Sequence, residues 1–414
     1  MSLSAEYALV KGFVKERIPA LLKEPRGYLH YPFIDPGSVY DGNVWDWDTY
    51  WSVYGLLPLM EELEPWLQEK ILVHARGNVL NLLDHQLEDG YVPMMVEYNG
   101  EEEPYLITKH KQGRIMNMCK PFLCRQAAMI SNYTGDYSWV DLGKLESYLA
   151  CYDRYYLHEA TGLYVWADDV MIGVDNDPAV FGRPPFSTAS VYLNSFLSGE
   201  FRAMAELLSA CGQDARSYLS KAEALSEKVR GMMFDGRDGW FYSQDVDVKT
   251  RAFDWFHQGL GVFWKTLPVK IQSWTGFIPM YEGIATEEQA WRLVQRYHAD
   301  KAFKCPYGIT TLSQDESMFN IDATINPSNW LGPVWLVANY VVQKGFRRYG
   351  YVKEAAEIAA ASLRLLAQDL RTSSELHEYY NPFTGAPVMN GGFINWNLLA
   401  LNMAQENKEE LYDC

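Results

Sequence analysis

The stretch VKEAAEIAAASLRLLAQDLR, residues 352–371, carries the periodicity that decides the fold class. Its apolar residues recur at spacings of three and four, which aligns them along one face of an α-helix. The residues of this face are Val352, Ala355, Ala356, Ala359, Leu363, Leu366, Ala367 and Leu370. Similar stretches recur along the chain, whereas strand patterns are few and short. The sequence therefore predicts an all-α fold.

The same periodicity predicts about twelve helices. They are expected at residues 5–23, 48–64, 68–87, 120–134, 138–159, 188–211, 214–232, 257–267, 285–299, 330–348, 352–371 and 395–407. A short hairpin is predicted where Asp238-Gly239 precedes Trp240-Phe241-Tyr242, because Asp-Gly favours the tight turn between two strands. The expected fold is thus all-α, with short β-hairpins in its loops.

The segments between the predicted helices alternate in length. Short links join the two helices of a pair, and long segments separate the pairs at residues 24–47, 88–119, 160–187, 233–256, 300–329 and 372–394. This alternation predicts a closed ring of roughly six helical hairpins whose long segments open at one end and carry the function. An open solenoid is the alternative, but it normally shows a sequence repeat, and none is found. No Pro/Gly/Ser-rich linker divides the chain, which favours one domain over residues 1–414.

Composition excludes several functional classes. The chain has 414 residues, of which 48% are hydrophobic and 21% charged, as in soluble globular proteins. A net charge of −17 argues against a nucleic-acid partner, and no apolar run is long enough to span a membrane. Residues 1–11 lack the features of a signal peptide, and the cysteines are scattered, which predicts reduced structural thiols and a cytoplasmic location. The six cysteines are Cys119, Cys124, Cys151, Cys211, Cys305 and Cys414.

The first long segment ends in an unusual run, Trp45-Asp46-Trp47-Asp48-Thr49-Tyr50-Trp51, directly before a predicted helix. Asp48 as a helix N-cap is one interpretation, because a carboxylate there accepts unpaired backbone N–H groups. Two acids between three tryptophans exceed what capping requires. A sugar ring stacks on an aromatic face while a carboxylate accepts its hydroxyl hydrogens, so Trp47 and Asp48 are predicted to bind a carbohydrate.

Two further carboxylates lie in aromatic segments far apart in the sequence. Asp175 lies in Ile172-Gly173-Val174-Asp175-Asn176-Asp177-Pro178, and Glu378 in His377-Glu378-Tyr379-Tyr380-Asn381-Pro382. They can face each other only if the helices close into a ring. Hydrolysis of a glycosidic bond needs such a pair, one as proton donor and one to activate water or the sugar carbon. The residues alone leave this pairing open.

Neighbouring side chains compete with the two carboxylates for these roles. Asp177, before a proline, resembles a turn initiator. Asp168 and Asp169 resemble a solvated loop, and Glu375 is expected to face solvent. His377 is next to the candidate base and either orients it or is a buried histidine with its own hydrogen-bond partner.

Five motifs, in order along the chain, resemble glycoside hydrolase family 63, which is related to trehalases. Trp47–Tyr50 is similar to its Trp-Asp-Ser/Thr-Tyr motif, and Asn329–Trp335 to its Tyr-Trp-Arg-Gly-Pro-Ile/Val-Trp motif. Val174–Pro178 resembles Trp-Asp-Asn-Ser-Pro, and residues 378–385 resemble Glu-x-Tyr-x-Pro-x-Thr-Gly. Residues 392–396 match a closing Gly-Phe-Ser-Trp element loosely. The resemblance covers most of the chain, from about residue 45 to residue 396.

The resemblance implies an (α/α)6 barrel and an inverting, exo-acting α-glycosidase that removes a terminal glucose or mannose. It implies Asp175 as general acid and Glu378 as general base. Some relatives hydrolyse mannosylglycerate or glucosylglycerate. Neither a metal nor a cofactor is predicted. By the same resemblance, the residues that contact the sugar are Trp47, Asp48, Trp330 and Trp335.

The sequence departs from the family at two positions. Leu331 replaces the usual Arg, and Lys120-Pro121-Phe122 stands where relatives often carry Gln-Pro-Pro. Lys120 is therefore either a substrate ligand or a surface lysine. The basic residues of segment 88–119 suggest a site for an anionic leaving group such as a sugar acid, with a hydrated loop as the alternative. These residues are Lys109, His110, Lys111 and Arg114.

Other functions stay open at this stage. Sugar isomerases and epimerases use similar barrels, although they usually rely on histidine bases. The histidines in or near the long segments are His110, His158, His257 and His377. A trehalase and a non-catalytic sugar-binding module are further alternatives; the latter needs no opposed pair of acids.

Overall fold

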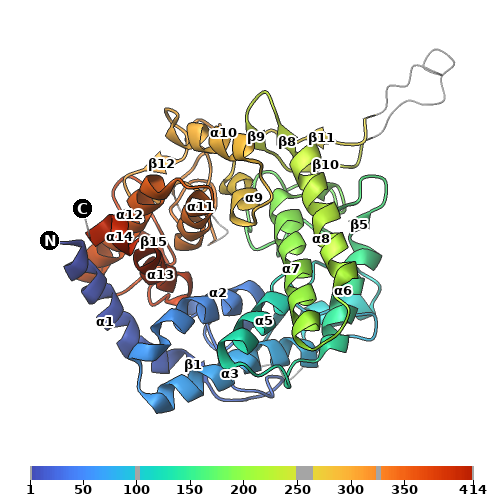
Figure 1. Ribbon diagram of the computed structural model, residues 1–414, viewed down its shortest axis with the longest axis horizontal. Coiled ribbons are helices and arrows are strands. Elements are labelled where there is room, and N and C mark those ends of the chain that lie inside the picture. The colour runs from blue at the N-terminus through green and yellow to red at the C-terminus, as the bar shows by residue number, and fades with distance from the viewer. Residues whose placement is uncertain (1, 98–102, 249–263, 323–327, 413–414) are drawn as a thin grey trace.

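Helices form a closed ring in the computed structural model, which describes residues 2–97, 103–248, 264–322 and 328–412 (Figure 1). The inner helices are α2 (Asp46–Leu56), α5 (Leu123–Thr134), α7 (Val191–Ala210), α9 (Ile278–Tyr281), α11 (Leu336–Arg348) and α13 (Leu399–Glu406). Each contacts the next in this order, and α13 contacts α2 again. The chain is predominantly helical, as predicted. Its N-terminal helix α1 (Leu3–Leu21) packs on α12 (Val352–Ser373) and also contacts α13, which brings the two ends of the chain together.

A second set of helices lies outside the first (Figure 1). It consists of α1 (Leu3–Leu21), α3 (Pro65–Asp84), α6 (Leu142–Tyr155), α8 (Arg216–Lys228), α10 (Glu287–His298) and α12 (Val352–Ser373). Burial distinguishes the two sets. Outer helix α1 buries one face through Val10, Val14 and Ile18, whereas inner helix α7 is buried on nearly all sides. The apolar stripe of residues 352–371 thus marks an outer helix with one buried face.

Shorter elements complete the fold. They are α4 (Tyr105–Lys111), α14 (Lys408–Tyr412), the 3-10 helices η1 (Ser38–Tyr40), η2 (Leu57–Glu62), η4 (Trp274–Phe277) and η5 (Asn395–Leu398), and the π-helical turn η3 (Val229–Met233). Every described strand has two or three residues: β1 (Leu22–Lys23), β2 (Phe33–Ile34), β3 (Val44–Trp45), β4 (Met95–Val96), β5 (Leu157–His158), β6 (Leu163–Tyr164), β7 (Thr188–Ala189), β8 (Phe234–Asp235), β9 (Trp240–Phe241), β10 (Gln244–Asp245), β11 (Leu267–Pro268), β12 (Lys304–Cys305), β13 (Gly308–Ile309), β14 (Tyr379–Tyr380) and β15 (Pro387–Met389). The predicted hairpin is confirmed as β8 and β9, which pair antiparallel around Gly239 (φ +67°).

Three predicted helices differ from the structure. The one predicted at 48–64 is α-helical only to Leu56, where α2 ends and the 3-10 helix η2 begins. Helix α11 begins at Leu336 and not at residue 330, because Gly332 (φ +151°) and Pro333 hold the preceding chain out of a helix. Of the helix predicted at 257–267, residues 257–263 lie outside the described part of the chain, and residues 264–267 are not helical. The inner position in this part of the ring belongs to η4 and α9, which the sequence interpretation missed.

The long segments meet at one end of the ring. Strand β3 pairs with β4, and Asn117 donates to the carbonyl of Asp168 over 3.0 Å. The Trp330 N–H donates to the side chain of Asn176 over 2.7 Å. Isolated β-bridges join Val334 to Tyr380 and Gly37 to Phe393. The second of these bridges connects the last long segment to the first. Four of the long segments, together with residues 330–334 that directly follow a fifth, are therefore linked in sequence around one mouth, as the alternation of lengths predicted.

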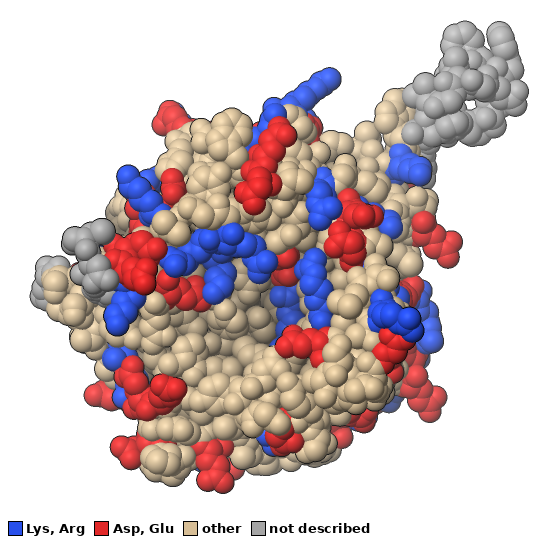
Figure 2. Space-filling view, in the orientation of Figure 1, with Lys and Arg blue, Asp and Glu red and all other residues tan. Residues whose placement is uncertain are grey.

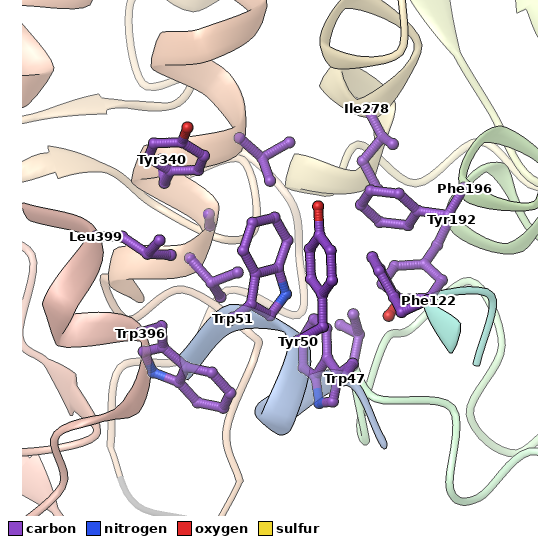
Figure 3. Close-up of a cluster of buried hydrophobic side chains, with 14 of the residues drawn as sticks. Trp47, Tyr50, Trp51, Phe122, Tyr192, Phe196, Ile278, Tyr340, Trp396 and Leu399 are labelled. Carbon is purple, nitrogen blue, oxygen red and sulfur yellow. The ribbon is translucent and has the colours of Figure 1, made fainter. Parts of the chain in front are cut away.

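Aromatic side chains fill the interior of the ring (Figure 3). Trp51 of α2 lies 5.9 Å from Tyr340 of α11, and Tyr50 lies 4.8 Å from Phe122, measured between ring centroids. These aromatic contacts join α2 to α11 and to the start of α5 in one core. Viewed from outside, one face of the ring is hollowed at its centre and carries interspersed basic and acidic side chains (Figure 2). None of the described helices combines the length and apolar character that a membrane span requires.

Candidate active site

Helix α2 delivers two carboxylates to the mouth of the ring. It begins at Asp46, and the residue in the N-cap position, Trp45, makes no side-chain capping bond. Asp48 lies inside the first turn, where its buried carboxylate accepts a hydrogen bond from Asn395 over 2.7 Å. The capping interpretation of Asp48 is therefore wrong. Burial and the nearby charge of Asp46 raise the pKa of Asp48 well above its usual range.

Glu378 lies immediately before β14 and is 1% exposed. Tyr40 donates a hydrogen bond to Oε1 over 2.9 Å, and the Asn390 amide donates to Oε2. Burial, together with the negative charge of Asp175, raises the pKa of Glu378 to about 7, although both hydrogen bonds act in the opposite direction. The result is a carboxylate held by two donors and able to change its protonation near neutral pH.

Asp175 reaches the same mouth from the loop before α7. It is half-buried and follows Gly173, whose φ of +86° suits glycine. Burial raises the pKa of Asp175, while a hydrogen bond from Ser328 and the charge of Lys120 lower it. The charge of Asp175 acts on both Glu378 and Asp48. Carboxylates more than two hundred positions apart in the sequence are thus brought within electrostatic range, as a closed ring requires.

The predicted sugar-binding tryptophans pack against one another. Trp47 lies 5.9 Å from Trp330, and Trp330 stacks on Trp335 at 3.8 Å and 12°. The other face of Trp335 is covered by Tyr379 at 4.7 Å and 16°. The other face of Trp330 is likewise covered, by Trp274 at 5.9 Å and 21°. Both Trp330 and Trp335 are fully buried, so neither has a free face for a sugar ring. Trp335 lies directly beneath Trp330, and contact of these two rings with the sugar stays a prediction.

Lys120 is buried at the mouth and is not a surface lysine. Its side chain is 1% exposed, and Nζ lies 2.8 Å from Oδ1 of Asp46. The alternative of a solvated lysine is therefore wrong. The ammonium group is already paired within the protein.

The side chains that compete with Asp175 and Glu378 have other partners. The side chain of Asp177 accepts from the N–H of Ala179 over 3.0 Å, which confirms it as a turn initiator. Glu375 is exposed. His377 Nδ1 lies 2.9 Å from Oδ2 of Asp369, which favours the alternative of a histidine with its own hydrogen-bond partner. Asp168 is held by Arg114 over 3.1 Å.

The basic residues of segment 88–119 are largely neutralised by acids. His110 bonds to Asp89 over 2.6 Å, and Lys111 pairs with Glu103. Arg114 pairs with Asp168 as above, and Lys109 lies over the ring of Tyr105 at 5.3 Å. These contacts favour the hydrated-loop alternative over a ready-made site for an anion.

Sequence interpretation missed several residues of the site. Tyr40, Asn390 and Ser328 hold the two central carboxylates, but none belongs to a quoted motif, and only their positions in or beside long segments pointed to them. Asn395 belongs to the closing motif, but its hydrogen bond to Asp48 depends on a contact 347 residues away in the sequence. In the described part of the chain, no group of three or more His, Cys, Asp and Glu is arranged to hold a metal ion. The described cysteines are free thiols.

Similar proteins share this arrangement of helices. The chain is 23% identical over 202 residues to mannosylglycerate hydrolase of Rubrobacter radiotolerans and 25% identical over 230 residues to that of Thermus thermophilus. These matches cover 49% and 54% of this chain and 40% and 47% of the two relatives, so they span less than half of either relative. The crystal structure of a GH63 mannosylglycerate hydrolase from Thermus thermophilus in complex with glucose has a TM-score of 0.68 at 19% identity, over 95% of this chain and 99% of that one. Neutral trehalase Nth1 from Saccharomyces cerevisiae has a TM-score of 0.57 at 15% identity, over 96% and 79%.

The match to a protein family is more extensive. Residues 42–396 match the mannosylglycerate hydrolase MGH1-like glycoside hydrolase domain, a span that includes all the candidate site residues except Tyr40. The class is therefore that of glycoside hydrolases. Within it, the chain belongs to the mannosylglycerate hydrolase MGH1-like family. This confirms the resemblance on which the sequence interpretation rested.

Proposed function

We propose that the protein is an inverting, exo-acting glycosidase that removes a terminal α-linked glucose or mannose from a small glycoside. Its scaffold is a single (α/α)6 barrel over residues 1–414. The closed circuit of inner helices, each backed by an outer helix, supports this barrel. The observation that carries the proposal is the pair of carboxylates, Asp175 and Glu378, in electrostatic range of each other at the mouth of the ring.

The surroundings of the two carboxylates assign their roles. The negative charge of Asp175 disfavours ionisation of Glu378, so a state in which one of the two carboxyls is protonated is favoured. Both oxygens of Glu378 accept hydrogen bonds from neutral donors, Tyr40 and Asn390, which favours the ionised form of Glu378. We therefore assign Glu378 as the base and, as the resemblance implies, Asp175 as the acid that carries the proton.

The chemistry follows from these assignments. Asp175 donates its proton to the glycosidic oxygen as the bond to the anomeric carbon breaks. Glu378 takes a proton from a water that attacks the same carbon from the opposite face, and the configuration inverts. This requires about 6.5–9.5 Å between the carboxyl groups in the substrate complex, the space of one water.

The terminal sugar lies among the aromatic rings at the mouth. Trp47 and the edge of Trp330, whose two faces are covered by other rings, border it, and the carboxylate of Asp48 accepts hydrogen bonds from its hydroxyls. Trp335 supports Trp330 from beneath, through the stack described above. A pocket closed by these rings admits one chain end, which makes the enzyme exo-acting.

A panel of substrates tests this function. Purified protein is incubated with mannosylglycerate, glucosylglycerate, trehalose and a neutral α-linked disaccharide, with Asp175→Asn as the blank. We expect release of one terminal sugar from at least one glycoside and none from the blank. Cleavage of trehalose alone would identify a trehalase, and equal or no activity on the glycerates would reject a leaving-group site for a sugar acid. Conversion of free mannose to fructose without hydrolysis would support an isomerase, and binding without product a sugar-binding module.

Loss of the Tyr40 hydroxyl is expected to move the pH dependence of the reaction. The hydrogen bond from Tyr40 favours ionised Glu378, so Tyr40→Phe raises the pKa of the base. The acidic limb of kcat/KM then shifts upward by about one pH unit, the equivalent of one hydrogen bond to a charged group. A pH–rate profile measures this shift. An acidic limb at the wild-type position would show that Tyr40 does not act on the base.

A further inference from the structure

Lys120 and Asp46 form an ion pair buried on both sides. Each side chain is 1% exposed, and Nζ lies 2.8 Å from Oδ1. Oδ2 of Asp46 accepts a second bond from the backbone N–H of Lys120 over 2.7 Å, and Oδ1 also accepts from the N–H of Trp47. A buried pair with this many bonds is rigid, and removing one partner leaves the other charge uncompensated.

The pair joins three segments of the site. Asp46 opens α2, two residues before Asp48. Lys120 precedes α5, and its methylene groups pack against Gly173, where an added Cβ would lie 3.0 Å from Cδ of the lysine. Gly173 is two residues before Asp175. The lysine therefore lies between the turn that carries one site carboxylate and the loop that carries another.

Charge makes this position more than a structural contact. The positive charge of Lys120 acts on both Asp48 and Asp175, and the negative charge of Asp46 acts on the same two residues in the opposite direction. The titratable groups that interact with the pair or with these two carboxylates are Tyr40, Asp48, Cys119, Tyr152, Asp175, Tyr192 and Glu378. Lys120 thus supplies positive charge in surroundings rich in carboxylates.

We propose that Lys120 is a positioning residue, held by Asp46, that compensates the charges of Asp48 and Asp175 and fixes their two segments against each other without touching the sugar. This rests on the proposed function, in which Asp175 is the general acid.

Two single variants test the role of charge by opposite effects. In Lys120→Gln the alkaline limb of kcat/KM, set by loss of the proton of the acid, shifts upward by about one pH unit, because a positive neighbour is lost. In Asp46→Asn it shifts downward by a similar amount, because a negative neighbour is lost. In the double variant Lys120→Gln/Asp46→Asn the alkaline limb of kcat/KM lies near that of the wild type. If Lys120→Gln raises KM and leaves the pH limbs of kcat/KM unmoved, Lys120 is a substrate ligand. If the alkaline limbs of Lys120→Gln and Asp46→Asn shift in the same direction, the pair acts through packing and not through charge. Either result overturns the proposal.

A measurement without substrate separates this inference from the proposed function. Folding raises the pKa of Asp48 and Asp175, so their ionisation destabilises the fold as pH rises. Without Lys120 this cost grows, and the Tm of Lys120→Gln falls further below the wild type at pH 8 than at pH 5. Lys344→Gln is the matched control. Lys344 forms a 2.7 Å ion pair with Glu406 near the C-terminal end of α11, and the variant breaks this pair. The difference between its Tm and that of the wild type does not grow with pH. If no glycoside is hydrolysed but this difference persists, the proposed function fails and the charge compensation stands; a pH-independent difference overturns the compensation itself.

Discussion

Glu378→Gln is expected to lower kcat by about 10³-fold, because an amide cannot take a proton from the attacking water. The variant keeps an oxygen acceptor for Tyr40, so binding of the sugar and the fold are retained. Initial rates on the best substrate of the panel measure the loss. Glu375→Gln is the matched control, an exposed glutamate three residues away that should keep wild-type activity. Wild-type turnover by Glu378→Gln would exclude this residue as the base.

Glu378→Gln is also expected to change how the thermal stability of the protein depends on pH. The pKa of Glu378 is raised in the folded protein to about 7, so this group destabilises the fold as pH rises through that value. Gln cannot ionise. The Tm of Glu378→Gln, relative to that of the wild type, should therefore be higher at pH 8 than at pH 5. Thermal melts at several pH values test this sign.

Asp175→Asn is expected to lower kcat by a similar factor of about 10³ on glycosides with poor leaving groups, because the leaving oxygen departs without a proton. An aryl glycoside whose phenolate leaves readily needs less protonation, so its loss should be much smaller. The dependence on the leaving group distinguishes a proton donor from a residue that only shapes the pocket.

The control for this prediction is Asp169→Asn, in the same loop. Asp169 accepts a backbone bond from Gly182 over 2.7 Å, and an amide oxygen can replace that acceptor. Its activity should remain close to the wild type on both kinds of glycoside. Equal losses by Asp175→Asn on good and poor leaving groups would contradict the role of general acid.

Periodicity predicted the long helices well, because a helix with one buried face has apolar residues at regular spacings of three and four in its sequence. Helix α12 ends within a few residues of its prediction, and its buried positions include most of the predicted stripe. The inner turn of η4 and α9 was missed for the converse reason. It is short, holds Pro279, and is buried on nearly all sides, so no apolar and polar faces alternate in it.

The site was predictable only in part. Asp48, Asp175 and Glu378 lie in motifs whose resemblance to a known family located them. The partners of Glu378 were not predictable, because they depend on loop conformation. Tyr40 reaches Glu378 through a turn in which Gly37 and Ser38 both have positive φ values, +83° and +62°. The burial of Lys120 was likewise not predictable, because it depends on a contact with Asp46, 74 positions away in the sequence.

The configuration of the released sugar tests the central claim most directly, because it reports where the water attacks. Proton NMR follows the anomeric signals during the first minutes of hydrolysis of an α-glycoside, before mutarotation mixes them. Attack by a water that Glu378 activates, opposite the bond that Asp175 protonates, predicts that the β-anomer appears first. First appearance of the α-anomer would mean retention through a covalent intermediate and would contradict the assignment of Glu378 as base.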